Sequence, residues 1–310
     1  MNVTFGICAD LHNDFIHDSV ERVEGFQQAC GERTVDFCVE LGDFCPPERP
    51  NDPPSVCTDK KRLLALLANR KTPFYHVLGN HDMDDHTKQA VIDYLDMKGA
   101  HYSFDCGGVH FIVLDACFYQ VGDQYYPYDL GNYKQAPPHA QVPVLPPSEL
   151  MWLEQDLAKT SYPSVIFSHQ SLIESRTGIR NPQDFRAVVR KAPAGVLMAI
   201  CGHEHVDRLE EKEGIYYLCL NSMAYYWAGG HYEHTTYGEE IESTHPLLRH
   251  VFPYRDPLYA IIQITEDAIN VSGTVSDMVG QSPESMNYRK AGLIDPITAS
   301  INDRHLRLKG

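Results

Sequence analysis

The sequence of 310 residues predicts an α/β fold, on three observations. Apolar runs of strand length recur along the chain, segments with helical spacing lie between them, and potential metal-binding side chains follow several of the runs. Alternation of strand and helix is typical of α/β domains. A hydrophobic content of 43% over this length is sufficient for a layered core, so the composition is that of an ordinary globular protein.

The predicted elements alternate through the first two thirds of the chain. Buried strands are predicted at residues 3–9, 35–41, 74–78, 111–114, 165–167 and 196–200, where each run is apolar and ends at polar or turn residues. Helices are predicted at residues 20–30, 61–69, 87–97 and 148–158. The second of these helices carries a leucine stripe, and the last follows Pro146-Pro147.

Towards the carboxyl end the pattern changes to antiparallel strands. Residues 216–220 form one predicted strand, and residues 259–265 and 268–275 form a hairpin. The predicted sheet is therefore mixed. We assign residues 1–276 to one domain and residues 277–310 to an arm or tail that packs on it.

Two long segments show no regular pattern. Residues 44–58 are rich in proline and acidic residues, and residues 117–147 are rich in tyrosine and proline. Loops of this length in a compact domain are usually functional or disordered.

Composition excludes several classes of protein. A formal charge of −16 opposes binding to a nucleic acid duplex and favours a small phosphorylated substrate. No apolar stretch approaches the ~20 residues of a membrane span, so no membrane partner is expected. The first nine residues lack the basic start of a secretory signal, and nine cysteines without a C-x-x-C pair indicate free thiols. These features predict a cytoplasmic location.

Five short blocks hold oxygen and nitrogen donors, each near the carboxyl end of a predicted strand. They are Asp10-Leu11-His12, Gly42-Asp43, Gly79-Asn80-His81-Asp82, Ser168-His169 and Gly202-His203-Glu204-His205. Loops at that edge of an α/β sheet can converge on one site. Carboxylate, imidazole and carboxamide without thiolate suit Mn, Fe or Zn ions. Two such ions activate water against a phosphate ester, and a neighbouring histidine can protonate the leaving group.

The ordered set of blocks resembles the calcineurin-like metallophosphoesterase family over roughly residues 3–226. That resemblance implies an αββα sandwich of two mixed sheets flanked by helices. It implies ligand roles for Asp10, His12 and His205 at one metal, for Asn80, His169 and His203 at the other, and for Asp43 at both. It also implies that His81 is the general acid, which contacts the substrate phosphate, and that Asp82 orients His81.

Within the family, the chain is most similar to the branch of class III cyclic-nucleotide phosphodiesterases and ADP-ribose or CDP-alcohol diphosphatases. This similarity rests on Tyr102-Ser103-Phe104, residues 111–115, Trp152-Leu153 and Ser168-His169. Two blocks depart from the family pattern, because Gly42-Asp43 lacks a second acid three residues later and His169 is followed by Gln170. Neither departure removes a ligand, but both fall on the expected pocket wall.

The predicted function is hydrolysis of a small phosphodiester or pyrophosphate, such as a nucleotide derivative, by attack of a hydroxide that bridges two divalent or mixed-valence ions. One alternative is a phosphomonoesterase or protein phosphatase on the same metals. A nuclease shares the metal blocks but lacks a basic track. A scaffold that keeps the fold without catalysis is the alternative from another class.

For the other candidate residues, a purely structural role stands beside a functional one. Asp115 ends a strand, but the ligand set is complete without it, so structural capping is preferred. The tyrosines at positions 119, 125, 126, 128 and 133 and the run 225–227 are suited to stacking on a base, to loop packing or to a contact in a homo-oligomer. Surface positions are preferred for Asp14, His17, His86, His231, His234, His245 and His250.

Overall fold

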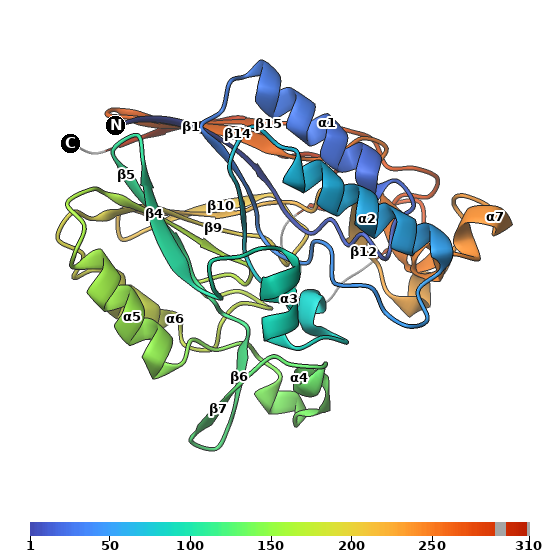
Figure 1. Cartoon of the computed structure of the whole chain (residues 1–310), viewed down its shortest axis with the longest axis horizontal. Coiled ribbons are helices and arrows are strands. Elements are labelled where there is room, and N and C mark those ends of the chain that lie inside the picture. Colours follow the sequence, from blue (N-terminus) through green and yellow to red (C-terminus); the bar gives the residue numbers. More distant parts are fainter. Residues whose placement is uncertain (289–295, 309–310) are drawn as a thin grey trace.

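The computed structural model describes residues 1–288 and 296–308, and two six-stranded sheets form its centre (Figure 1). The first sheet has the order β16-β15-β14-β1-β2-β3. Its strands are β1 (Asn2–Cys8), β2 (Phe37–Glu40), β3 (Phe74–His76), β14 (Ala260–Thr265), β15 (Ala268–Gly273) and β16 (Arg304–Arg307). Strands β1, β2 and β3 are parallel, and the other three are antiparallel to their neighbours.

The second sheet has the order β10-β11-β9-β8-β5-β4. Its strands are β4 (Tyr102–Cys106), β5 (Val109–Val113), β8 (Ser164–Ser168), β9 (Val196–Cys201), β10 (Arg208–Lys212) and β11 (Ile215–Cys219). The four inner strands are parallel, and the two edge strands are antiparallel. Both sheets are therefore mixed, as predicted.

The helices are α1 (Ser19–Glu32), α2 (Pro54–Ala68), α3 (Lys88–Tyr94), α4 (Asn132–Gln135), α5 (Pro147–Leu157), α6 (Pro182–Val189) and α7 (Glu239–Glu242). Helices α1 and α2 pack on the outer face of the first sheet, and α5 and α6 pack on the outer face of the second. Figure 1 shows α1 and α2 on one side of the molecule and α5 and α6 on the other. The αββα sandwich is confirmed.

Alternation along the strands builds three layers of core. In β1, Phe5 and Ile7 face the second sheet, whereas Cys8 faces α1 and α2. In β8, Phe167 faces the first sheet and Ile166 packs under α5 and α6. A period of two places successive side chains on opposite faces, so strands that are buried on both faces are apolar throughout.

The two segments without a predicted pattern contain regular structure. Helix α2 begins at Pro54, inside the segment 44–58, because proline is favoured in the first turn of a helix. The segment 117–147 contains a hairpin of β6 (Phe118–Val121) and β7 (Gln124–Pro127), followed by α4. That hairpin is a separate two-stranded sheet with exposed side chains, so it lacks the apolar signal of a core strand.

Several further elements were not predicted. They include helices α6 and α7, the edge strands β4 and β10, and strand β12 (Tyr225–Trp227) with its partner β13 (Val251–Pro253). Helix α6 is short, and strand β10 is partly exposed. Of the predicted tail, β16 pairs with β15 at the sheet edge, whereas residues 289–295 and 309–310 lie outside the described residues. The domain boundary at residue 276 stays a prediction.

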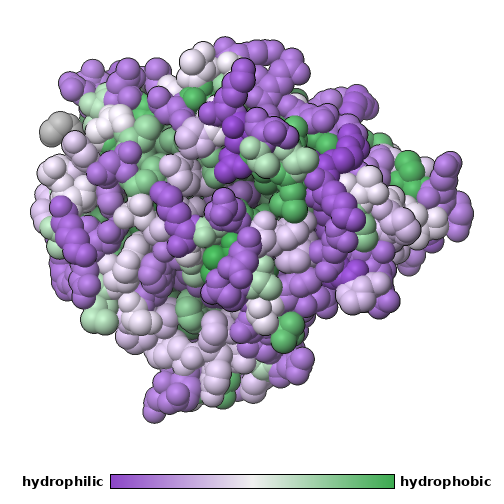
Figure 2. All heavy atoms as spheres, viewed as in Figure 1, coloured by the Kyte–Doolittle hydropathy of each residue, from purple (hydrophilic) through white to green (hydrophobic). Residues whose placement is uncertain are grey.

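The surface seen in Figure 2 is largely hydrophilic, with hydrophobic residues in small groups. In the described part of the chain no helix is long and apolar enough to cross a membrane. All nine cysteines are free, and seven of them are buried.

Candidate metal centre

The loops that follow five parallel strands converge at one edge of the two sheets. Asp10 follows β1, Asp43 follows β2 and Asn80 follows β3, while His169 and His203 follow β8 and β9 of the other sheet. Backbone hydrogen bonds join these loops, from Asp10 N to Gly42 O at 3.1 Å and from Gly202 N to His169 O at 3.1 Å. The site therefore lies between both sheets, and each sheet supplies part of it.

The backbone at these positions is strained. The left-handed conformation is uncommon for residues other than glycine, and it costs on the order of 1 kcal/mol or more for each one. Positive φ angles occur at Asp10 (53°), His12 (50°), Asp43 (53°), His203 (68°) and His205 (53°). Such strain persists where surrounding contacts fix the backbone, and it is concentrated at functional sites.

One group of donors consists of Asp10, His12 and His205, all buried. The Nε2 atoms of His12 and His205 lie 3.4 Å apart, and His205 Nε2 lies 3.4 Å from Asp10 Oδ1. Asp10 is itself fixed, because His203 N donates to its carboxylate at 3.0 Å. Three donor atoms thus face a common point.

A second group consists of Asp43, His169 and His203. His169 Nε2 lies 3.1 Å from Asp43 Oδ2, 3.2 Å from His203 Nδ1 and 3.2 Å from Asn80 Oδ1. Asp43 Oδ2 also lies 3.7 Å from His12 Nε2, so this carboxylate is adjacent to both groups. All seven side chains predicted as ligands are brought together.

The hydrogen bonds of two histidines leave lone pairs that point into the site. His205 Nδ1 lies 2.9 Å from Tyr225 O, and His169 Nδ1 lies 2.8 Å from Leu41 O. Because a carbonyl only accepts, Nδ1 carries a proton in each ring, and Nε2 is the atom that presents a lone pair when the ring is neutral. Several acceptor atoms then face one another at hydrogen-bonding distance, an arrangement that a bound cation satisfies.

The electrostatics of the site also favour positive charge. Burial alone lowers the pKa of His169, but the carboxylates of Asp43 and Asp10 raise it to about 10. Burial lowers the pKa of His12 to about 3, so its imidazole is neutral and able to bind a metal. The donor set therefore fits two divalent ions in both its chemistry and its charge.

Three glycines allow this close approach. A Cβ atom at Gly79 would lie 2.1 Å from Asp43 N and 2.2 Å from Asp43 Oδ1. A Cβ atom at Gly202 would lie 2.5 Å from Asp10 Oδ2, and one at Gly42 would lie 2.6 Å from Gly79 N. The glycine before each ligand is thus a steric requirement of the site.

His81 lies at the same site, but a different residue orients it. His81 Nδ1 lies 2.7 Å from Asp84 Oδ2, and 37% of the His81 side chain is exposed. Burial lowers the pKa of His81, yet Asp43 and Asp84 outweigh that effect and the net shift is upward. The imidazole is therefore held by Asp84 and accessible to a ligand.

The orienting role predicted for Asp82 is wrong. Its carboxylate is fully buried and accepts hydrogen bonds from the backbone N–H groups of Asp43 (3.0 Å), Phe44 (3.0 Å) and Gly79 (2.8 Å). Asp82 and His81 are neighbours in a short 3₁₀ turn, so their side chains point in different directions. Asp82 fixes the ligand loops, whereas Asp84 reaches the histidine.

The carboxylate of Asp84 collects three donors. Besides His81, it accepts from Tyr133 Oη at 2.8 Å and pairs with Lys134 Nζ at 2.6 Å. Burial raises the pKa of Asp84, but these hydrogen bonds, first that from His81, lower it overall. Tyr133 Oη also accepts from Asn80 Nδ2 at 3.3 Å, which turns Asn80 Oδ1 towards His169.

Asp115 has the capping role that was preferred for it. Asp115 Oδ2 pairs with Lys88 Nζ at 2.5 Å, and Asp115 Oδ1 accepts from Cys117 N at 2.9 Å. The first contact joins the loop after β5 to α3, and the second lies within that loop.

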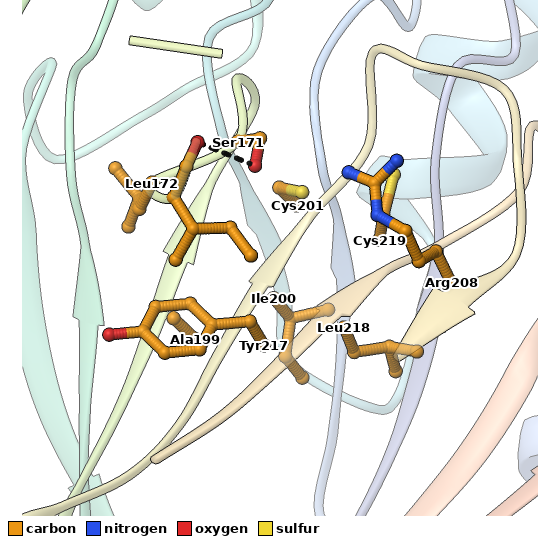
Figure 3. Close-up of a pocket in the computed structure, with 10 residues that line it drawn as sticks. Ser171, Leu172, Ala199, Ile200, Cys201, Arg208, Tyr217, Leu218 and Cys219 are labelled. Atoms are coloured by element: carbon orange, nitrogen blue, oxygen red, sulfur yellow. Dashed lines mark hydrogen bonds between the residues drawn. The ribbon is translucent and has the colours of Figure 1, made fainter. Parts of the chain in front are cut away.

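A cleft of about 530 Å³ opens onto the two donor groups. Its walls include His12, Phe15, Asp43, Arg49, His81, Asp84, Asp85, Lys134, Arg176, Thr177, His203, Glu204, His205, Tyr225, Tyr226, Trp227 and Leu247. This volume is in the usual range for small-molecule sites. A second pocket, behind β9 and β11, holds only about 10 Å³ between Ser171, Tyr217 and Cys219 (Figure 3), which is room for about one water.

Some of the aromatic residues considered for base stacking line the cleft, and the others pack elsewhere. Trp227 lines the cleft and is 36% exposed, and Tyr225 and Tyr226 are buried in its wall. Tyr133 holds Asp84, whereas Tyr119, Tyr125, Tyr126 and Tyr128 do not line the cleft and pack in or near the hairpin.

The remaining histidine candidates form no comparable group. Within residues 1–288 and 296–308, the groups of three or more close donors are the two described above. Asp14 pairs with Arg49 at 2.6 Å, and the ring of His17 packs on Tyr237 with centroids 4.4 Å apart.

The roles of three residues of the site, Asp84, Tyr133 and Arg176, were not predicted from the sequence. Asp84 lies two residues after the block Gly79-Asn80-His81-Asp82, so its closeness in sequence was a usable signal, although the orienting role was predicted for Asp82. Tyr133 lies in the short helix α4 and Arg176 in the segment between β8 and α6, and neither belongs to a ligand motif. Their positions depend on loop packing that no local pattern encodes.

The family model of the calcineurin-like phosphoesterases matches residues 3–207. The chain belongs to the calcineurin-like phosphoesterase family. Members of this family are dimetal phosphoric ester hydrolases, and the two donor groups lie where such a site requires them. No curated protein matches the chain at the level of sequence.

Two solved structures share the fold. A dimetal phosphatase from Danio rerio has a TM-score of 0.61 and 17% identity, covering 90% of this chain and 99% of that one. GAP50, the anchor in the inner membrane complex of Plasmodium, has a TM-score of 0.57 and 14% identity, covering 100% and 90%. At these identities the likeness shows the fold alone.

Proposed function

We propose that this protein hydrolyses a small phosphodiester or pyrophosphate, with nucleotide derivatives as its substrate class, by means of two divalent metal ions. The observation that carries the proposal is the convergence of seven donor side chains from five loops, with His81 on the same cleft. Asp10, His12 and His205 would hold one ion, Asn80, His169 and His203 would hold the other, and Asp43, adjacent to both groups, would serve both.

The chain's own contribution is to hold the donors and the reacting group in place. When bound, two such ions neutralise phosphate charge and lower the pKa of water from 15.7 toward about 7. Backbone carbonyls fix the ring orientation of His169 and His205, and Asp82 fixes the loops of Asp43 and Gly79. The nitrogen and oxygen donors suit Mn, Fe or Zn.

His81 is the proton donor to the leaving oxygen in this proposal. It lines the cleft, its ring is partly exposed, and Asp84 holds its Nδ1, so that Nε2 is the atom available to a substrate. A positioned acid of this kind contributes about 10²–10⁴-fold to the rate.

The walls of the cleft support a small substrate with an aromatic part. Phe15 and Trp227 line it with ring centroids 6.2 Å apart, and Phe15 stacks on His12 at 5.0 Å. An aromatic base stacks well on such faces. A phosphoprotein would need an extended groove, whereas this site is a cleft of about 530 Å³ lined by loops from several elements.

Hydrolysis of bis-p-nitrophenyl phosphate by the Mn²⁺-loaded protein tests the proposal. The wild type should cleave it, and His81→Ala should lower kcat by about 10²–10⁴-fold while metal content stays the same. His139→Ala, which removes an exposed histidine outside the cleft, is the matched control. A His81→Ala rate equal to that of wild type would show that His81 is not the acid.

Two further measurements separate the alternatives. A higher kcat/KM on p-nitrophenyl phosphate than on its diester would indicate a phosphomonoesterase on the same metals. Absence of bound metal together with absence of hydrolysis after addition of Mn²⁺, Fe²⁺ or Zn²⁺ would indicate a non-catalytic member of the fold.

A further inference from the structure

Three cationic side chains line the cleft, and they differ in whether an acidic group already neutralises them. Arg49 pairs with Asp14 at 2.6 Å and with Asp85 at 2.7 Å. Lys134 pairs with Asp84 at 2.6 Å. Arg176 forms no ion pair or hydrogen bond through its side chain within residues 1–288 and 296–308, and it is exposed to the cleft. Of the three, it is the cation left for a ligand.

The loop that carries Arg176 is fastened on both sides. Before it, Glu174 accepts from Arg186 at 2.9 and 2.6 Å and from Lys212 at 2.7 Å. After it, Ile179 N donates to Ser171 O at 2.9 Å, which closes the loop. A fixed backbone places the guanidinium at a defined point of the cleft, so less freedom is lost when a ligand binds.

The neighbour of Arg176 adds an unsatisfied hydroxyl. Thr177 Oγ1 is buried, has no hydrogen-bond partner in the described part of the chain, and lines the same cleft. A buried hydroxyl without a partner costs free energy unless a ligand or water meets it. Arg176 and Thr177 together offer a cation and a hydroxyl to one anionic group.

These two residues come from the segment between β8 and α6, a different part of the chain from the groups that hold His81. His81 is held by Asp84, next to Lys134 and Tyr133, whereas the charge of Arg176 acts on the hydroxyl of Tyr226 in the β12 wall. The cleft, at about 530 Å³, is much larger than one phosphate. One guanidinium group can donate two parallel hydrogen bonds to two oxygens of a phosphate. A second phosphate group of the substrate is therefore a matching ligand for Arg176.

We propose that Arg176 and Thr177 form a subsite for the second phosphate of a pyrophosphate substrate, so that the cleft prefers pyrophosphates to esters with a single phosphate. This inference rests on the proposed function for the reacting phosphate and names the substrate class within it.

Titration calorimetry of the Mn²⁺-loaded protein with two probes tests the subsite. The probes are α,β-methylene-ADP, whose pyrophosphate link is not hydrolysable, and AMP, which has one phosphate. Wild type should bind α,β-methylene-ADP at least about tenfold more tightly than AMP, as one charge-assisted contact allows. Arg176→Ala should abolish that preference, and Arg176→Lys should restore part of it because the charge returns without the paired geometry.

Arg180→Ala is the control, since Arg180 is exposed on the same loop and donates to His139 O away from the cleft. It should keep the wild-type preference. An equal loss for both probes in Arg176→Ala would assign Arg176 to the reacting phosphate, and no loss for either would remove it from binding; both outcomes overturn the subsite. Cleavage of bis-p-nitrophenyl phosphate by wild type is measured separately, because its absence contradicts the proposed function whatever the binding result.

Discussion

The hydroxyl of Tyr133 donates a hydrogen bond to Asp84 Oδ1 at 2.8 Å and accepts one from Asn80 Nδ2 at 3.3 Å. One side chain from α4 thereby links the residue that orients His81 to a predicted metal ligand. The tyrosine-rich segment has no ligand motif of its own, but it thus helps to position residues of the site.

Tyr133→Phe should lower kcat about tenfold with little change in KM, because Asn80 and Asp84 each lose one restraint while the cleft keeps its shape. The measurement is steady-state hydrolysis of bis-p-nitrophenyl phosphate. Tyr126→Phe, at an exposed position of the hairpin, is the matched control and should behave as wild type. Equal kinetics in both variants would leave Tyr133 with a packing role.

Asp84→Asn should lower kcat by about 10–100-fold, since an amide holds the His81 imidazole less well than a carboxylate does. Asp84→Glu should recover part of the rate, which a purely structural loss would not allow. Metal content, measured by atomic emission, should stay at the wild-type level. A rate that changes only in proportion to lost metal would assign Asp84 to the metal loops instead.

Asp82→Asn should destabilise the protein by about 1–3 kcal/mol, because an amide N–H₂ would face backbone N–H groups that now share a carboxylate. Urea unfolding followed by circular dichroism measures the change. His81→Ala, one residue earlier and partly exposed, should cost less. The reverse order of stability would contradict the roles given to the two side chains.

Gly79→Ala should reduce the metal bound per chain, since the new Cβ would lie 2.1 Å from Asp43 N and push this ligand away. Gly31→Ala is the control, because a Cβ there meets nothing within 4 Å, and alanine favours a helix. Full metal content in Gly79→Ala would show that the Asp43 loop can move without losing the site.

The pH dependence of stability tests the contacts of Glu174, which fasten the loop that carries Arg176. Hydrogen bonds from Arg186 and Lys212 lower the pKa of Glu174 from 4.5 to about 2. Its stabilising contribution is therefore complete above pH 4.5 and is lost as the pH falls from 4.5 toward 2. Because 48% of the side chain is exposed, we expect less than about 1 kcal/mol.

The measurement for Glu174 is the difference in unfolding free energy between wild type and Glu174→Gln at pH 6, 4 and 3. The difference should be largest at pH 6 and shrink at pH 3. Glu240→Gln, at an exposed position of α7, removes the same charge as a control. A difference that stays constant across this range would mean that the pairs with Arg186 and Lys212 do not persist in solution.

The predictions from sequence were strongest where one residue type serves one local purpose. The apolar runs predicted nine strands, because burial on both faces leaves a signal within each run. The hairpin of β6 and β7, by contrast, has no buried face, so its sequence carries no such apolar signal. The start of α2 was missed since Pro54 can open a helix as readily as it can interrupt one.

The sequence alone determined the family and predicted the donor residues, because glycine, carboxylate and imidazole at strand ends have few structural substitutes. Only the tertiary structure decided which acid orients His81, which tyrosine holds Asn80, and which of three cations in the cleft has no ion pair among the described residues. Those relationships join residues on separate loops. Their distances depend on how two sheets pack, and no stretch of the chain records that.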